Sequence, residues 1–582
     1  MSIESAARFF VTFRRRALSA IAGFALAGVV ATPAVAETTY LDQGWGPQLR
    51  ELFYYTPQGS RLAPLAWFKA LPTLDGKGRF ASADNLGRYG FLSEDYGPER
   101  GATTEINTAG LPIGFAVDPV EQLGTGQWVG LTCAACHTGD VRHEGKTYRI
   151  EGGPAMVDFD RFLADLSRTV RATAFDERLR NVFFANLTGG QPLPEPVLRQ
   201  LADQIATYAS TLLGRAAQRA PVHPSGPGRV DALTQIVNSL AVVDLGEPDN
   251  YYPVGAPTSY PQLWLAPALE FVQWSPIAAS PIARNAGEVL GVFGHANLSG
   301  AQETLFSSTA RLEELAKLEA WIEKLTPPRW PEADFGAIDR AKWTTGKALF
   351  DDNCLGCHNM PPFRMTDPAV NAFGMQFIEI GKIENAVVGT DPTYIQSLAG
   401  RLVKTGNLSH LLFDDRPAVT GGEFFLRTVG AVVGTQLAES LLPPEVQAKL
   451  NGFRFRPPKG PGQKPEIYRP DSLTALKASP LMGVWATGPY LHNGSVPSVY
   501  DMLSRPEDRP KVFFVGSRDL DLVKLGFKSG GAPGRYRFDT NLPGNGNGGH
   551  IYPADKAFDE DEKAAVIEYL KDPVRFMEGA GQ

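Results

Sequence analysis

The chain has 582 residues and a net charge of −7. Its first 36 residues are net positive, so the rest is more acidic than the whole, which argues against nucleic acid or an anionic membrane as a partner. The 60 glycines and 46 prolines predict long ordered loops around a limited helical core. The length predicts two large domains or one bilobed body.

Residues 1–36 have the pattern of a Sec-type signal peptide. Arg8 and the run Arg14 to Arg16 supply a positive start, and an uncharged stretch over 17–30 forms the apolar centre. Ala34-Val35-Ala36 is a small-residue cleavage site. The apolar stretch is too short to span a bilayer, and no later stretch is long and apolar enough. We therefore expect a periplasmic or secreted protein with no membrane span after cleavage.

A five-residue pattern occurs twice, as Cys133-Ala134-Ala135-Cys136-His137 and Cys354-Leu355-Gly356-Cys357-His358, and the two copies hold all four cysteines. C-x-x-C-H is the attachment signature of c-type haem, in which the thiols bond to the porphyrin and the His binds iron. A zinc site has no need of His at both fifth positions, and cysteines spaced by two form disulfides poorly. The sequence predicts two covalently bound haem c groups, with His137 and His358 as iron ligands.

The residues that follow the first motif predict regular secondary structure. Two short segments flank Glu144-Gly145-Lys146 and predict a β-hairpin. Apolar residues at helical spacing then predict helices over 159–170, 198–212 and 312–325. Prolines end the last of these, and we expect a domain boundary near 326–338.

This boundary gives an N-terminal haem c domain over 37–330 and a C-terminal haem c domain over 331–582. In the second domain, residues 343–352 predict a helix that runs into Cys354, with the small Gly346 leaving room for close packing. Asp559 and Glu562 have the spacing of a capping box for the last helix. The predicted fold is mainly α, with two cytochrome c-like domains, long ordered loops and little β structure.

Two histidines are candidates for the second ligand of the C-terminal iron. His550 closes a glycine-rich loop over 543–549, which can approach a flat cofactor closely because glycine has no Cβ. His492 lies in the turn-rich stretch 488–497. Met502 is a weaker alternative.

The stretch Pro489 to Pro497 resembles a motif of bacterial di-haem cytochrome c peroxidases and of the related di-haem enzyme that matures tryptophan tryptophylquinone. In those proteins the sixth ligand of the C-terminal haem follows the motif and precedes the last helix. The resemblance therefore favours His550 as the ligand. It implies that His492 orients the haem or lies on its electron path.

The chain more closely resembles the di-haem rubber oxygenases and periplasmic fatty-acid dioxygenases, through five stretches: residues 130–139, Gly152-Gly153-Pro154-Ala155, Ser259-Tyr260-Pro261 with Leu263-Trp264, Arg284-Asn285-Ala286-Gly287-Glu288, and the loop ending at His550. In that branch the N-terminal haem binds oxygen on a face lined by apolar residues and a Trp. Trp264 matches that residue, and Trp274 is the alternative. The chain is shorter than typical rubber oxygenases.

The resemblance implies a dioxygenase whose partners are O2 and an apolar unsaturated substrate, either a lipid or a polyisoprenoid. A small periplasmic electron donor is a further expected partner. Arg284 is the expected partner of a propionate or carboxylate, since its planar fork suits bidentate pairing. One alternative is a peroxidase that reduces H2O2, which needs a distal acid–base group; no His or Glu has a sequence context that assigns it this role. The other is an electron-transfer cytochrome with both irons saturated.

Overall fold

The structure is a computed structural model that describes residues 38–94, 103–119, 126–460, 463, 465–468 and 470–577. The predicted signal peptide lies outside these residues. The described residues belong to one compact unit that begins at Thr38. Within them, no helix combines the length and the apolar character needed to cross a membrane.

Two small sheets carry the first Cys-x-x-Cys-His motif. In one, β5 (Thr138–His143) and β6 (Lys146–Glu151) form the predicted hairpin, and β1 (Thr38–Tyr40) adds in parallel to β6. The hairpin turn needs left-handed backbone at Glu144 and Gly145, with φ of 47° and 81°. The other sheet has the order β2-β4-β3, from β2 (Ala63–Pro64), β4 (Trp128–Leu131) and β3 (Phe115–Asp118). The motif follows β4 and precedes β5, so both sheets fix its position.

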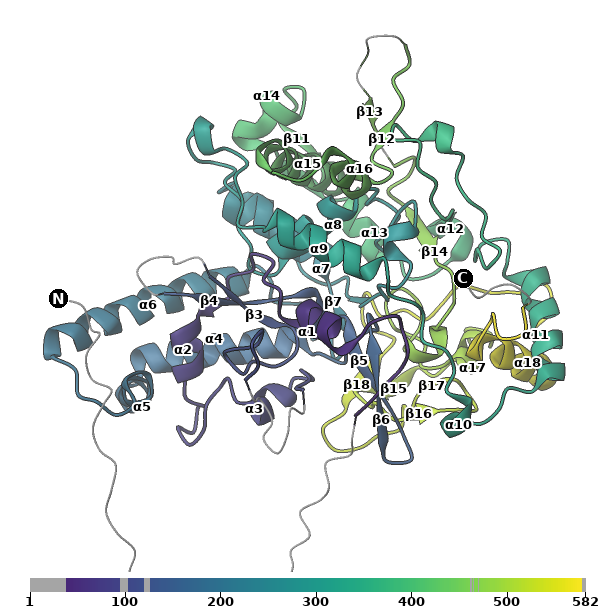
Figure 1. The fold of residues 1–582 in the computed structure, drawn as a ribbon, viewed down its shortest axis with the longest axis horizontal. Coiled ribbons are helices and arrows are strands. Elements are labelled where there is room, and N and C mark those ends of the chain that lie inside the picture. The colour runs from purple at the N-terminus through teal and green to yellow at the C-terminus, as the bar shows by residue number, and fades with distance from the viewer. Residues whose placement is uncertain are drawn as a thin grey trace, which may run out of the picture. The chain divides into compact units, whose positions relative to one another are not determined.

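The helices predicted for the N-terminal half are all present. They are α4 (Phe159–Phe175), α6 (Glu195–Ala217) and α9 (Leu312–Ile322), and α4 and α6 lie side by side in Figure 1. The remaining helices of this half are α1 (Pro47–Tyr55), α2 (Leu65–Ala70), α3 (Ala83–Gly87), α5 (Glu177–Thr188), α7 (Ala232–Asn238) and α8 (Pro281–Gly291). Its other strands are β7 (Arg229–Val230) and β8 (Thr258–Ser259).

In the C-terminal half, α11 (Arg340–Asn353) and α18 (Glu560–Lys571) pack side by side, as Figure 1 shows. The predicted capping box is present, because the Asp559 side chain accepts from the Glu562 N–H and the Glu562 side chain accepts from the Asp559 N–H. Gly346 permits the close contact: a Cβ there would lie 1.9 Å from the Ala565 carbonyl oxygen. Both sequence predictions are confirmed.

The rest of this half consists of short elements. Its helices are α10 (Glu332–Phe335), α12 (Asn385–Val388), α13 (Thr393–Ala399), α14 (Ser409–Leu412), α15 (Gly421–Glu439), α16 (Pro444–Asn451) and α17 (Val499–Met502). Its strands form two-stranded ribbons: β9 (Gly381–Glu384) with β14 (Ala475–Ala478), β10 (Leu402–Lys404) with β11 (Ala418–Thr420), β12 (Phe455–Arg456) with β13 (Glu466–Ile467), β15 (Val512–Val515) with β18 (Tyr536–Asp539), and β16 (Leu520–Asp521) with β17 (Gly526–Phe527).

The prediction of a mainly α fold with little β structure is wrong. Of the described residues, 39% lie in helices and 14% in strands, spread over many small sheets without a dominant helical bundle. The physical reason is that the segments rich in Gly and Pro do not stay as open loops. Their backbone groups need partners when buried. Pairing into ribbons of two to four residues per strand supplies them without the long alternating pattern that reveals a strand in the sequence.

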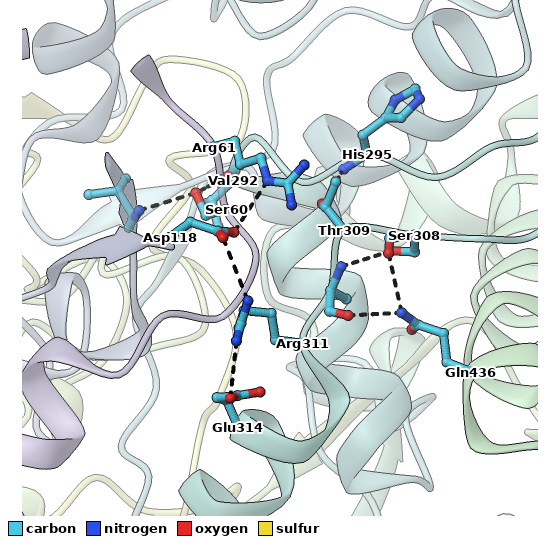
Figure 2. A network of polar contacts seen from close by, with 12 residues as sticks. Ser60, Arg61, Asp118, Val292, His295, Ser308, Thr309, Arg311, Glu314 and Gln436 are labelled. Carbon is cyan, nitrogen blue, oxygen red and sulfur yellow. Dashed lines mark hydrogen bonds and ion pairs between the residues drawn. The ribbon is translucent and has the colours of Figure 1, made fainter. Parts of the chain in front are cut away.

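A single hydrophobic cluster joins the two halves, since Leu315 and Leu318 of α9, Leu290 of α8, Val432 of α15 and Trp485 all belong to it and are 0% exposed. Polar contacts lie at its edge, and Gln436 of α15 links the two halves there (Figure 2). Within the N-terminal half, Asp118 at the end of β3 lies between Arg61 and Arg311. The Gln436 side chain donates to the Ala310 carbonyl at 2.8 Å.

Candidate functional site

The first Cys-x-x-Cys-His motif forms a tight turn, η1 (Cys133–Ala135), against the chain at Gly114. A Cβ at Gly114 would lie 2.3 Å from the Ala135 backbone, so only glycine fits there. His137 Nδ1 lies 2.8 Å from the Pro261 carbonyl oxygen. A carbonyl only accepts, so Nδ1 carries the proton and Nε2 keeps a lone pair. Metal-bound histidines are commonly held in this way.

Cys133, Cys136 and His137 line a cavity that we call the N-terminal cavity. Burial lowers the pKa of His137 to about 4 and raises that of Cys136 to about 12. The imidazole is therefore neutral at pH 7, which is the form that binds a metal. Among the described residues that line this cavity, His137 is the only His and there is no Met.

The second motif follows the end of α11 and repeats this arrangement. His358 Nδ1 lies 2.7 Å from the Ser479 carbonyl oxygen, so its Nε2 is also the free nitrogen. Burial lowers the pKa of His358. Cys354, Cys357 and His358 line a second cavity, the C-terminal cavity.

His550 faces His358 across the C-terminal cavity, with their ring centroids 6.2 Å apart. Two imidazoles on opposite sides of one metal ion, each bonded at about 2 Å, place their centroids roughly 6 Å apart. The His550 backbone has a φ of 51°, and its N–H donates to the Val388 carbonyl at 2.7 Å. Burial lowers the pKa of His550 to about 3. The glycine-rich loop thus presents a neutral imidazole opposite His358.

The other two candidates for this position also line the C-terminal cavity. His492 is 5% exposed, and its ring lies 6.0 Å from that of Tyr394. Burial lowers the pKa of His492 to about 4. Met502 ends α17. Of the three, His550 is the one whose ring faces the His358 ring at the spacing of a shared metal ion.

The two cavities have a stretch of protein in common, which we call the shared wall. It consists of the residues that line both cavities: Ser259, Tyr260, Pro261, Gln262, Trp274, Lys477 and Ser479. Trp274 Nε1 donates to the Ser259 carbonyl at 2.8 Å, and the Trp274 carbonyl accepts from the Lys477 N–H at 2.8 Å. The carbonyls that orient His137 and His358 both belong to this wall, so one stretch of protein borders both sites.

Trp264 lines the N-terminal cavity and not the C-terminal cavity. It is 2% exposed, and its Nε1 donates to the Met482 carbonyl at 2.9 Å. Leu265, Leu269 and Val272 continue the apolar lining beside it.

Arg284 also lines the N-terminal cavity, on α8, but its charge already has a partner. It forms a buried ion pair with Glu319 of α9. Asn285 joins the same carboxylate, since its Nδ2 donates to Glu319 Oε1 at 2.7 Å. The charge of Arg284 is therefore balanced within the protein by Glu319, and its expected pairing with a propionate or substrate carboxylate stays a prediction.

Glu288 is a cavity residue that sequence reasoning missed. It lies one helical turn after Arg284 on α8 and lines the N-terminal cavity, and Gln273 Nε2 donates to its Oε1 at 2.8 Å. Burial raises the pKa of Glu288. Gln273 adopts a φ of 74°, a strained value for a residue with a Cβ. The spacing of Arg284 and Glu288 was the available signal, because residues four apart share one face of a helix.

Lys477 in the shared wall was also missed, and no motif marks it. Burial lowers the pKa of its amine to about 8, and the charged neighbour that acts on it is Arg284, another cation. Among the described residues, no hydrogen-bond or ion-pair partner reaches its ammonium group.

A model of the family described as RoxA-like, cytochrome c-like matches residues 475–514, which include Lys477, Ser479 and His492. The chain is 32% identical to the uncharacterized protein y4iJ of Sinorhizobium fredii (strain NBRC 101917 / NGR234), over 93% of this chain and 94% of that protein. It is 25% identical to the uncharacterized protein y4iM of the same organism, over 47% of this chain and 50% of that one.

The family match supports haem c as the cofactor and a relationship to the rubber oxygenase-like di-haem cytochromes. The identity to y4iJ extends over nearly the whole of both chains. The chain therefore belongs to the family of y4iJ and carries a RoxA-like cytochrome c segment.

Proposed function

We propose that the protein is a periplasmic or secreted di-haem c oxidoreductase, which holds one covalently attached haem in each cavity and acts as a dioxygenase on an unsaturated lipid or polyisoprenoid. The observation that carries this proposal is the asymmetry of the cavities. In the C-terminal cavity His550 faces His358, whereas in the N-terminal cavity His137 is the only imidazole among the described lining residues.

The residues present fit a haem in each cavity. Each motif brings two thiols and a neutral imidazole with a free Nε2 to one cavity wall. Bound haem iron with one open position binds oxygen or peroxide, whereas iron with two strong ligands transfers electrons. The N-terminal cavity is accordingly the proposed reaction site, and the C-terminal cavity the proposed electron store.

The N-terminal cavity has walls that suit a hydrocarbon. Leu265, Leu269, Val272 and Ile322 line it together with Trp264. Each methylene that leaves water for such a surface contributes about 0.8 kcal/mol, so a long chain binds without polar anchors along its length. These side chains also exclude water from the reacting double bond. Trp274 and the rest of the shared wall connect the two cavities.

Peroxide reduction is a second candidate function, and Glu288 favours it. A buried carboxyl group held by Gln273 in the N-terminal cavity can accept and return the proton that peroxide cleavage moves. This group supplies the distal acid–base residue that the sequence did not identify.

The direct test is to incubate the purified holoprotein with O2 and either oleate or polyisoprene, measure oxygen consumption and identify the products. The proposal predicts oxygen uptake and an oxygenated or cleaved chain with at least one of these substrates. Turnover of H2O2 with a reduced cytochrome, without oxygen uptake with either substrate, would replace the dioxygenase by the peroxidase.

A further inference from the structure

Lys477 is a partly exposed cation with no acidic partner among the described residues. It lies on β14, in the wall shared by the two cavities. Burial lowers the pKa of its amine to about 8, so most of the population still carries the charge at pH 7. When a molecule fills the adjacent cavity, this charge loses its contact with water, which is costly unless an opposite charge pairs with it. A lysine in this position therefore calls for a partner of opposite charge.

The acidic groups nearby are already engaged. Glu319 pairs with Arg284 and binds Asn285. Glu288 accepts from Gln273, and burial raises its pKa, which favours its neutral form. Neither carboxyl contacts the Lys477 ammonium. An anion that pairs with Lys477 would therefore come from a molecule that occupies one of the cavities.

We propose that Lys477 is a carboxylate-binding residue in the shared wall, which pairs with an acid group of whatever fills the adjacent cavity. This inference rests on the proposed function, because both sources of the acid are bound there. One source is a haem propionate; the other is the head group of a fatty acid whose chain lies in the N-terminal cavity. A Lys–carboxylate pair shielded from water is the strong form of this interaction.

The chain offers a matched control in Lys382. It lies directly opposite Lys477 in the β9–β14 ribbon, but its Nζ is 3.2 Å from Glu270 Oε2 and it lines neither cavity. Replacing either lysine by methionine removes one charge from the same ribbon. Only Lys477→Met removes a charge from the cavity wall.

The first arm of the experiment measures the midpoint potentials of the holoproteins by spectroelectrochemical titration without lipid. If the acid is a propionate, Lys477→Met lowers the potential of at least one haem, because losing a nearby positive charge favours the oxidised iron. Lys477→Arg restores most of the potential, and Lys382→Met leaves it unchanged.

The second arm measures binding of oleate and of its uncharged methyl ester. If the acid belongs to the substrate, Lys477→Met weakens oleate binding about tenfold or more, as expected for a hydrogen bond to a charged group, and leaves the ester unaffected. Unchanged potentials together with unchanged oleate binding would overturn the proposal.

Two controls keep the outcomes separate. Iron and haem content of the wild type are measured first, and fewer than two haems per chain would contradict the proposed function rather than the role of Lys477. If Lys477→Met does not load haem, Lys477→Gln is measured in its place, with the same criteria.

Discussion

At the scale of single residues, the main feature of the C-terminal cavity is a pair of imidazole rings that face each other, with their centroids 6.2 Å apart. His358 directly follows Cys357 in the chain, whereas His550 is presented by a loop nearly two hundred residues later. Its position rests on the Val388 carbonyl and on Arg509, whose Nη1 donates to the Gly549 carbonyl at 2.9 Å.

Replacing His550 by alanine is expected to remove the second ligand of the C-terminal iron. The oxidised protein should then lose its low-spin signal and gain a high-spin one, as measured by electron paramagnetic resonance. His492→Ala is the matched control, because His492 is a buried histidine of the same cavity. A C-terminal haem that stays six-coordinate and low-spin in His550→Ala would show that another residue is the ligand.

Glu288→Gln separates the two candidate reactions. Burial raises the pKa of Glu288, so the carboxylate that accepts a proton from peroxide forms only at a higher pH than usual for Glu. Peroxide turnover by the wild type should rise with pH through that raised pKa. In the variant this rise with pH should be absent, and the rate of peroxide turnover should be about 10²- to 10⁴-fold lower.

Oxygen uptake with a lipid does not need this proton acceptor, so Glu288→Gln should retain it. If the variant reduces peroxide at the wild-type rate with the same pH profile, Glu288 has no acid–base role.

Sequence alone identifies both motifs because their chemistry is local, and it favours His550 because a glycine loop and a family motif mark it. It does not reveal Lys477, since a single lysine acquires meaning only when two cavities form on either side of it. The partner of Arg284 was missed for the same reason: Glu319 lies on another helix.

At the scale of elements, α11 and α18 pack so closely at Gly346 that there is no room for a side chain. Gly346→Ala places a methyl group where the Ala565 backbone lies, so the two helices must separate. We expect a loss of about 1–3 kcal/mol in the free energy of unfolding, as for other overpacked cores. Chemical denaturation measures it, and the haem spectrum should shift as well because α11 runs into Cys354.

Gly214→Ala in α6 is the control for this prediction, because no atom lies within 4 Å of its added Cβ. Alanine should there stabilise the helix slightly. Equal effects of the two substitutions would contradict the proposed tight contact.

His295 and Asp244 connect the loop after α8 to the segment after α7, with Nδ1 2.6 Å from Oδ1. The hydrogen bond to Asp244 raises the pKa of His295 above its ordinary value of 6.5. The charged pair therefore contributes fully below pH 6.5, and its contribution disappears as the pH rises through the raised pKa.

His295→Gln should lower the melting temperature modestly, and more at about pH 5.5 than at about pH 9. His410→Gln, at an exposed position on α14, is the control and should change it at neither pH. A loss for His295→Gln that is equal at both pH values would contradict the charged pair.

Elements whose apolar residues recur at a regular spacing were predictable from the sequence, and short elements without such a spacing were not. The apolar stripes of α4, α6 and α9 and the capping box of α18 are read directly from residue spacing. Ribbons such as β16 with β17, two residues per strand, have no period to detect. Their pairing depends on distant contacts, which is why the fold prediction underestimated strand.

At the scale of the whole molecule, one hydrophobic cluster includes residues from both halves of the chain. The shared wall is built in the same way, from Ser259 to Gln262 and Trp274 in one half and Lys477 and Ser479 in the other. Each cavity thus depends on both halves. The predicted division into domains at residue 330 stays a prediction, whereas the connection between the two sites follows from this common wall.

The central claim is that the two iron sites are unequal, one with two imidazoles and the other with one. Electron paramagnetic resonance of the oxidised wild-type protein, with the spins quantified per chain, measures this directly. We expect one low-spin bis-imidazole signal and one high-spin signal in equal amounts. Two low-spin signals, or spin from a single iron per chain, would contradict it.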